Sequence, residues 1–376
     1  MARKTKKQIE ELKKKFNVDR LWSWSRYNCY KTSKYEYMLK YIQKAKETRK
    51  NIYGDSGNLC HDVLEKFYSG EIKYEDMISE YEEGLLTFNL AELKYDRSDD
   101  EKNEKIAQKY EACIKHFFKN HKIINHKLAL EKFITIKIKP FVFQGYIDSV
   151  YKVGDKYYIT DWKTSSIYKG KKIDKEKGQL ILYAEGLRQM GVPLNQIVCQ
   201  WAFLKYVDIT FMQKNGREKT MTAERHIWVG KIKSKLRMNL KDIGWEEDEI
   251  DEAVNYATEF NTIENLPKEV QDLYKVEDCY VEIPFNQDEI DELKEDIYHT
   301  LMEIHKKENE YAKTEDDEIF WDEVNDGNSY YFANLCGYSA EQHKPYGQYL
   351  SDREMFKDKE EEEVDSSDWM DELNLT

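Results

Sequence analysis

An ordered series of strand and helix patterns between residues 128 and 207 constrains the fold more than any other feature of the sequence. Three stretches have the alternation or the β-branched and aromatic content typical of strands, an amphipathic helix follows them, and a further strand pattern ends the series. The expected strands are residues 128–138, 145–152, 156–164 and 197–207, and the expected helix is 178–190. This order predicts an α/β fold built on a mixed sheet flanked by helices.

Helical patterns dominate on the N-terminal side of this core. We expect a short basic helix at 4–16, an aromatic-rich helical stretch at 23–43, a glycine-broken loop at 54–57, a helix at 58–68 and two or three helices between 74 and 122. On the C-terminal side we expect a strand pair and helices in 207–278, a strand at 280–285 and a long helix at 289–309.

The patterns divide the chain into five expected parts. They are a basic N-terminal helix (1–20), a core (21–206), a strand pair with a helical region (207–278), a strand and long helix that return to the core (279–350) and an acidic tail (351–376). The tail carries eleven acids against three bases, including four consecutive glutamates, so we expect it to be disordered. Its last residues place apolar side chains among acids, which is typical either of a peptide that docks on a partner or of a solubilising tail.

Composition indicates a soluble protein of a reducing compartment. Hydrophobic residues make up 40% and charged residues 35%, and no apolar run approaches the roughly 20 residues that span a bilayer. The six cysteines are scattered without a CxxC pair, and the N-terminus is charged rather than apolar, so we expect a cytoplasmic protein with free thiols and no contact with a membrane.

The net charge of −14 does not exclude nucleic acid as a partner. The tail alone contributes −8 of it, whereas residues 1–20 carry eight bases against three acids. Attraction to phosphate is local and is screened beyond about 10 Å, so a basic face can coexist with an acidic total.

A short hairpin in the core brings two acids together. Gly154 and Asp155 are typical of a two-residue type II′ turn, and this register places Asp148 opposite Asp161 with their β-carbons about 5 Å apart. Lys163 lies two residues after Asp161 and projects from the same face. Apposed carboxylates are destabilising unless something compensates them, and a hard divalent cation would do so. The alternative is an exposed hairpin whose charged side chains have no role.

Five short motifs in order resemble the RecB-type PD-(D/E)XK nuclease family, which includes AddB-like exonucleases. They are S-x-S-R-x-N at 23–28, G-x-x-x-H-x-x-L-E at 57–65, G-x-x-D at 145–148, D-x-K-T at 161–164 and Q-x-x-x-Y at 179–183. The resemblance covers roughly residues 23–206, with a fainter return at 330–346. It implies a restriction-endonuclease-like core.

The resemblance also implies a set of site residues and a cofactor, Mg²⁺ or Mn²⁺. The implied metal ligands are His61, Asp148, Asp161 and the backbone carbonyl of Trp162, the implied catalytic residues are Lys163, Asp148, Asp161 and Glu131, and the implied substrate-binding residues are Gln179 and Tyr183. Glu65 lies one helical turn after His61 on the same face and is a candidate for holding its imidazole in place.

The sequence departs from this family at its iron–sulfur site. Ser33 stands where the first cluster cysteine of relatives would fall, and Cys336 is the only cysteine kept in the C-terminal return segment. One thiolate of four cannot hold such a cluster, so we expect none. Packing of residues 330–346 against the opening helical stretch is expected to replace it.

We therefore expect a Mg²⁺-dependent DNA nuclease, most simply an exonuclease, acting in recombination, repair or phage DNA metabolism. A metal-activated water would attack the phosphodiester while the cation and Lys163 stabilise negative charge. No helicase-type phosphate loop is present, so unwinding would come from another protein; a helicase, recombinase or single-strand-binding protein could dock on the tail. The alternatives are a catalytically inactive nuclease fold that binds DNA or assembles complexes, and a nuclease directed at RNA.

Overall fold

The computed structural model describes residues 4–47, 50, 52–97, 99–213, 215–324, 328–329, 331–338, 346–348 and 350–351. The expected acidic tail after residue 351, and the segment 339–345 of the expected return motif, lie outside these residues. Within them, no helix combines the length and the apolarity needed to cross a bilayer.

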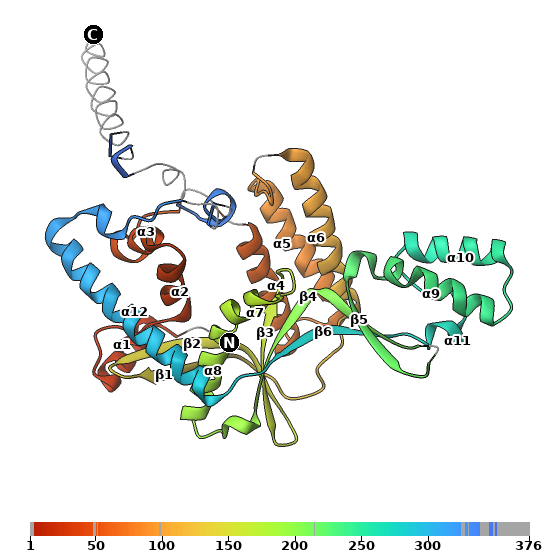
Figure 1. Ribbon diagram of the computed structural model, residues 1–376, viewed down its shortest axis with the longest axis horizontal. Coiled ribbons are helices and arrows are strands. Elements are labelled where there is room, and N and C mark those ends of the chain that lie inside the picture. The colour runs from red at the N-terminus through yellow and green to blue at the C-terminus, as the bar shows by residue number, and fades with distance from the viewer. Residues whose placement is uncertain are drawn as a thin grey trace, which may run out of the picture. The chain divides into compact units, whose positions relative to one another are not determined.

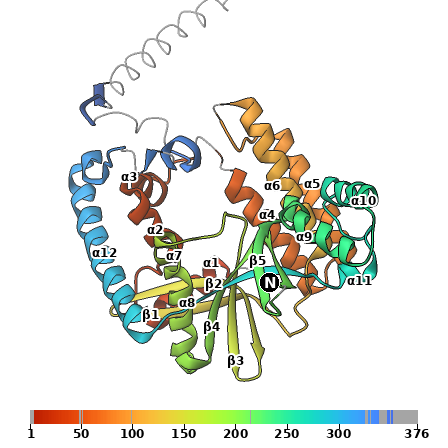
Figure 2. The same cartoon turned by 45° about the vertical axis from the view of Figure 1, so that its right-hand side comes forward.

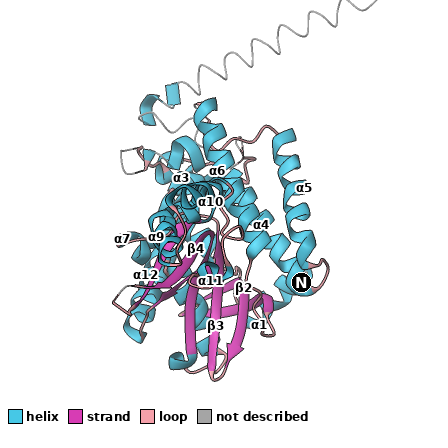
Figure 3. Cartoon of the chain, turned by 90° about the vertical axis from the view of Figure 1, so that its right-hand side faces the viewer, coloured by secondary structure: helices cyan, strands magenta, loops and turns pink. Residues whose placement is uncertain are grey.

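Six strands form one mixed sheet (Figures 1 and 3). They are β1 (Ala129–Ile138), β2 (Phe141–Val153), β3 (Lys156–Lys163), β4 (Ile197–Met212), β5 (Glu218–Glu224) and β6 (Lys275–Ile283). The strand order is β1-β2-β3-β4-β5, and β6 pairs with β4. Among the strand pairs of the described residues, only β3 and β4 are parallel, and the connection between them contains α7 (Lys171–Glu176) and α8 (Gly178–Gln189). The predicted mixed sheet flanked by helices is confirmed.

The predicted hairpin between β2 and β3 has the expected register. Gly154 has a φ of 60°, Asp155 does not have a positive φ, and Val153 pairs with Lys156 across a two-residue loop. The positive φ at the first turn residue is what a type II′ turn requires and what glycine adopts without strain. The turn therefore sets which residues of β2 and β3 face each other.

Two groups of helices pack against the sheet. The first contains α4 (Ile52–Ser69), α5 (Met77–Leu90) and α6 (Asp100–Asn120), which share a hydrophobic cluster with Trp162 of β3 and Ala202 of β4. The second contains α8, which lies so close to β1 that a β-carbon at Gly186 would be 2.7 Å from Ile134. These contacts hold the motif-bearing strands between helices that also carry motif residues.

The expected loop at 54–57 is wrong, because Gly54 and Gly57 lie inside α4. Glycine in a helix costs about 1 kcal/mol relative to alanine, and burial of one face of the helix outweighs this cost. The buried residues of that face are Ile52, Ser56, Cys60, Val63 and Leu64. The basic helix expected at 4–16 is α1, which spans Lys6–Phe16.

Residues 207–278 form a helical region with a hydrophobic cluster of its own. It contains α9 (Trp228–Asp242), α10 (Glu247–Glu259) and the short α11 (Lys268–Gln271), which gather beside the ends of β4 and β5 (Figure 2). The strand pair expected here is the second half of β4 with β5. β4 therefore continues from the core into this region without a break.

The chain divides into two compact units, which we describe separately. One contains Met1–Leu21 and Ile52–Glu295, including the whole sheet, and the other contains Trp22–Asn51 and the described residues from Asp296 onward. The helical region at 207–278 belongs to the first unit, although the sequence assigns it a separate part.

The second unit is built from α2 (Trp24–Thr32), α3 (Lys34–Tyr37), the π-helical turn η1 (Met38–Gln43) and the part of α12 (Gln287–Thr314) after Asp296. The expected single helical stretch at 23–43 is interrupted at Ser33, which caps α3 and donates a hydrogen bond to Asp322. Phe332 and Cys336 pack with Leu39, so residues 331–338 contact the opening stretch as predicted.

A buried ionic network ties β6 to the helical region in the first unit. Arg225 is 1% exposed and lies 2.5 Å from one carboxylate oxygen of Asp278, while His121 donates to the other oxygen at 2.6 Å. Burial would raise the pKa of Asp278, but the hydrogen bond from His121 and the charge of Arg225 outweigh it and lower the pKa. Asp278 therefore stays ionised at neutral pH.

We predict that Asp278→Ala lowers the free energy of unfolding by about 3–5 kcal/mol, because it leaves the guanidinium of Arg225 buried without a counter-ion. Urea denaturation would measure this change. Asp272→Ala, which removes an exposed ion pair to Lys268, is the matched control and should change stability by less than about 0.5 kcal/mol. Equal effects of the two substitutions would contradict the assigned role of Asp278.

Candidate active site

Asp148 and Asp161 come together where the β2–β3 ladder ends. The last backbone pair of that ladder is Ser149 with Thr160, and the two acids are the next residues on their strands. Asp148 accepts a hydrogen bond of 3.1 Å from the backbone N–H of Trp162, and its side chain is 15% exposed. Asp161 is 4% exposed. The two acids therefore lie opposite each other, as predicted, and their side chains are largely buried rather than exposed on an open hairpin.

Lys163 lies against Asp161, with Nζ 2.7 Å from Oδ2. That oxygen is buried and accepts no hydrogen bond of good geometry in the described part of the chain. Burial would lower the pKa of Lys163, but the charge of Asp161 outweighs it and raises the pKa. Lys163 is therefore a cation beside the acids, suited to stabilising negative charge rather than to accepting a proton.

The acids carry more negative charge than their surroundings balance. Burial raises the pKa of Asp148 above its ordinary value, the charge of Asp161 raises it further, and His61 and Lys163 oppose these effects without cancelling them. A carboxylate that is hard to ionise in this way would gain from an additional cation.

His61 reaches the same place from α4. Its Nε2 lies 2.8 Å from the backbone carbonyl oxygen of Trp162, and its Nδ1 lies 3.5 Å from Oδ2 of Asp148. The 2.8 Å separation is close to the roughly 3 Å between adjacent ligands of an octahedral ion with bonds of about 2.1 Å. The imidazole and the carbonyl are thus near enough to share one metal ion.

The donor set fits a hard divalent cation, although no three His, Cys, Asp or Glu side chains of the described residues form a ready-made metal cluster. In the structure Lys163 contacts the carboxylate of Asp161, and the imidazole of His61 contacts the Trp162 carbonyl oxygen. A cation would take the place of these two contacts, and the buried Oδ2 of Asp161 without a hydrogen bond would become a ligand.

Glu131 lies opposite Asp148 on the neighbouring strand. Leu130 pairs with Ser149 and Lys132 with Ile147, so the register places Glu131 between them, across from Asp148. Its φ of 43° is in the left-handed region, which is strained for a residue with a side chain. The strain interrupts the ladder at the acids, and strain of this kind often accompanies functional sites.

Gln179 and Tyr183 lie one turn apart on α8, and Gln179 Nε2 donates to the Tyr183 hydroxyl at 3.0 Å. The ring of Tyr183 approaches Gly145 so closely that a β-carbon there would lie 2.9 Å from it. The glycine of the G-x-x-D motif thus makes room for the tyrosine. The charges of Asp148 and Asp161 act on Tyr183, so these motifs meet at one site.

Tyr168 also belongs to this surface, although the sequence analysis did not single it out. It is 7% exposed, Lys163 and Asp161 act electrostatically on its hydroxyl, and the ammonium of Lys172 lies 4.9 Å from its ring centroid. Tyr168 stands alone in a lysine-rich stretch, where no periodic pattern marks it. Its packing against Trp201 and Phe203 of β4 is visible only in the fold.

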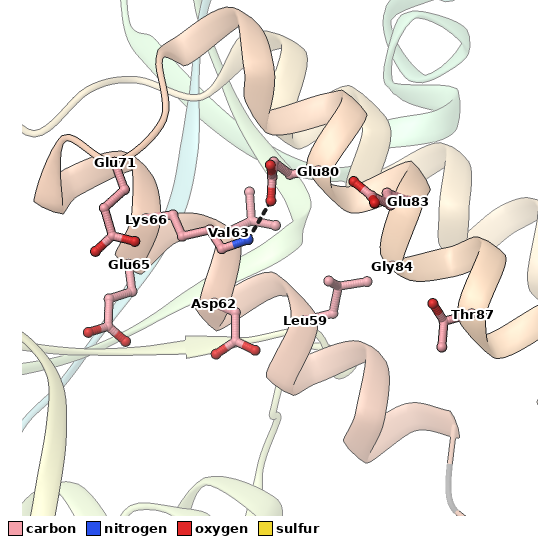
Figure 4. Close-up of a pocket in the computed structure, with 10 residues that line it drawn as sticks. All are labelled: Leu59, Asp62, Val63, Glu65, Lys66, Glu71, Glu80, Glu83, Gly84 and Thr87. Atoms are coloured by element: carbon pink, nitrogen blue, oxygen red, sulfur yellow. Dashed lines mark hydrogen bonds and ion pairs between the residues drawn. The ribbon is translucent and has the colours of Figure 1, made fainter. Parts of the chain in front are cut away.

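Glu65 lines a cavity of about 640 Å³ between α4 and α5, together with Asp62 and Glu71 (Figure 4). The same cavity contains an ion pair between Lys66 and Glu80 at 2.5 Å. None of the expected metal ligands lines it. That Glu65 orients His61 stays a prediction.

The comparison with protein families agrees with this geometry. A sequence model of the PD-(D/E)XK nuclease superfamily matches residues 21–339, which include parts of both units and every expected site residue. No curated protein sequence matches the chain. The sheet with its flanking helices is accordingly consistent with a restriction-endonuclease-like core.

We predict that, in EDTA, Asp148→Asn raises the thermal unfolding midpoint at pH 8 and raises it by less than half as much at pH 5. The pKa of Asp148 is raised in the folded state, so ionising it destabilises the protein as the pH rises above the unfolded pKa of about 3.9 and through the folded pKa. An increase of at least about 2 °C is expected at pH 8. Asp155→Asn, in the turn of the same hairpin, is the control. The same change at both pH values would show that charge is not the cause.

We also predict that His61→Ala weakens Mn²⁺ binding about tenfold or more, because it removes an expected ligand. Isothermal titration calorimetry measures the affinity without any nucleic acid. His126→Ala, which removes an exposed histidine outside the site, should leave the affinity unchanged. Unaltered binding by the His61 variant would exclude this imidazole from the ligand set.

Proposed function

Because the chain belongs to the PD-(D/E)XK nuclease superfamily, we propose that it is a divalent-metal-dependent deoxyribonuclease that uses Mg²⁺ or Mn²⁺. The observation that carries this proposal is the apposition of Asp148 and Asp161 beside a protonated Lys163, with His61 and the Trp162 carbonyl within reach. A site retained only for binding or assembly would have no need of two acids that repel each other.

Different residues of the site have different roles in phosphodiester hydrolysis. Asp148, Asp161, His61 and the Trp162 carbonyl would hold the cation, which would make a water molecule acidic enough to attack and would neutralise charge on the phosphate. Once the cation has replaced its contact with Asp161, Lys163 would place a positive charge where negative charge develops on the phosphate.

The other residues act on the substrate. Gln179 and Tyr183 present hydrogen-bonding groups on one helix face beside the acids, where they would contact the strand that is cut. Glu131, opposite Asp148, would assist as a further acid. The order of the five motifs supports an AddB-like exonuclease, and we place its activity in recombination, repair or phage DNA metabolism in the cytoplasm.

We predict that Asp161→Asn and Lys163→Gln each lower metal-dependent cleavage of DNA by about 100-fold or more. Lys152→Gln, an exposed lysine on the same hairpin, is the matched control and should cleave at the rate of the unaltered protein. Gel assays with end-labelled DNA in Mg²⁺, Mn²⁺ or EDTA measure the rates. Cleavage that survives both site substitutions would contradict the assignment.

The same assay distinguishes the substrates. Labelled single- and double-stranded DNA and RNA, in linear and circular forms, are compared under identical conditions. An exonuclease degrades linear DNA from an end and spares circles, whereas an endonuclease cuts both. Metal-dependent cleavage of RNA alone would replace DNA as the substrate. No cleavage of any substrate would favour a binding or assembly role.

A further inference from the structure

A second polar cavity lies in the first unit away from the acids. It has a volume of about 500 Å³ and is formed by the end of α6, the start of α9, the segment after α10 and β6. Its lining includes His116, Lys119, Lys122, Trp228, Phe260 and Asn261. None of the expected active-site residues lines it, and its size is within the range of small-ligand sites.

Two of the acids in this cavity are already neutralised. Asp278 is held between Arg225 and His121, and Glu277 pairs with Lys275 at 2.8 Å. They therefore add little negative potential to the cavity.

Two lysines in the lining are available to an anion. The side chains of Lys119 and Lys122 make no ion pair within the described residues, and both residues are exposed. Glu264 is the one remaining acid of the lining. The balance of unpaired charge is therefore positive, which favours a ligand that carries a phosphate.

The same cavity offers an aromatic face and uncharged hydrogen-bonding groups. Phe260 is 58% exposed, an unusual value for phenylalanine, and its ring centroid lies 4.5 Å from that of Tyr256. Trp228 is 5% exposed, and its indole N–H has no acceptor in the described residues. Nδ1 of His116 also lacks a partner there, and burial, with the charge of Arg225, lowers the pKa of this histidine to about 4.

We propose that this cavity binds an unpaired nucleotide of the DNA strand on which the enzyme acts. Lys119 and Lys122 contact its phosphate, its base packs against Phe260, and the polar edge of the base supplies partners for Trp228 and His116. Exposed aromatic rings beside lysines are the usual means of binding single strands without sequence preference. This inference rests on the proposed nuclease function and assigns a role to the helical region at 207–278.

The distance to the acids suits such a subsite. On β4, Trp201 pairs with Asp161 and Val207 lines the cavity, and the six residue steps from Trp201 to Val207 span about 20 Å or less. A stacked strand that rises 3.4 Å per nucleotide covers this distance in about six nucleotides. The subsite would therefore hold a nucleotide about six positions or fewer from the bond that is cut.

Fluorescence anisotropy with a labelled single-stranded oligonucleotide in EDTA tests binding without cleavage. Phe260→Ala should weaken binding about tenfold, and Lys119→Gln with Lys122→Gln should lower the slope of log affinity against log salt by about 1.4. The controls are Leu90→Ala, an exposed apolar residue on α5, and Lys105→Gln, an exposed lysine on α6. Only variants whose thermal unfolding midpoint equals that of the unaltered protein are compared. Unchanged affinity and slope in the cavity variants would overturn the inference.

An oligonucleotide with one abasic position moved along the strand tests the base contact. The unaltered protein should lose affinity at one position within about six nucleotides of the cleavage point, and Phe260→Ala or Trp228→Phe should remove that minimum. A flat profile would overturn the base contact, whereas cleavage by the unaltered protein would still support the nuclease. Position-dependent binding without any cleavage would instead contradict the proposed function.

Discussion

The burial of two carboxylates side by side, those of Asp148 and Asp161, is the constraint that shapes this site. A two-residue turn aligns β2 with β3 so that both acids fall at the end of the ladder, half-closed from solvent. Lys163 and His61 supply part of the compensating charge, yet the pKa of Asp148 remains raised. Such a cluster reduces stability in the absence of a cation, which is a usual sign of a site shaped for function rather than for folding.

The surrounding structure holds this site in place. α4 brings His61 to the Trp162 carbonyl, α8 brings Tyr183 over Gly145, and Glu131 breaks the β1–β2 ladder beside Asp148. The first two of these contacts each join a motif on a helix to a motif on a strand. Motifs that are separate in the sequence therefore become one site through packing of helices against the sheet.

Much of the fold and the site could be predicted because local signals were strong. The Gly154 turn, the amphipathic helix containing Gln179 and the order of strands all rest on patterns within a few residues, and the structure agrees with them. Elsewhere tertiary packing overrode local propensity: Gly57 lies within α4. The sequence does not predict Tyr168 as a site residue or the cavity beside Phe260. Their contacts come from segments far apart in the sequence, which produce no periodic pattern.

The most direct test of the central claim is anomalous diffraction from crystals soaked in Mn²⁺. We predict a peak within coordination distance, roughly 2 Å, of carboxylate oxygens from both Asp148 and Asp161, with Nζ of Lys163 displaced from Asp161. Full occupancy of Mn²⁺ elsewhere, or a site in which the two acids do not share an ion, would contradict it.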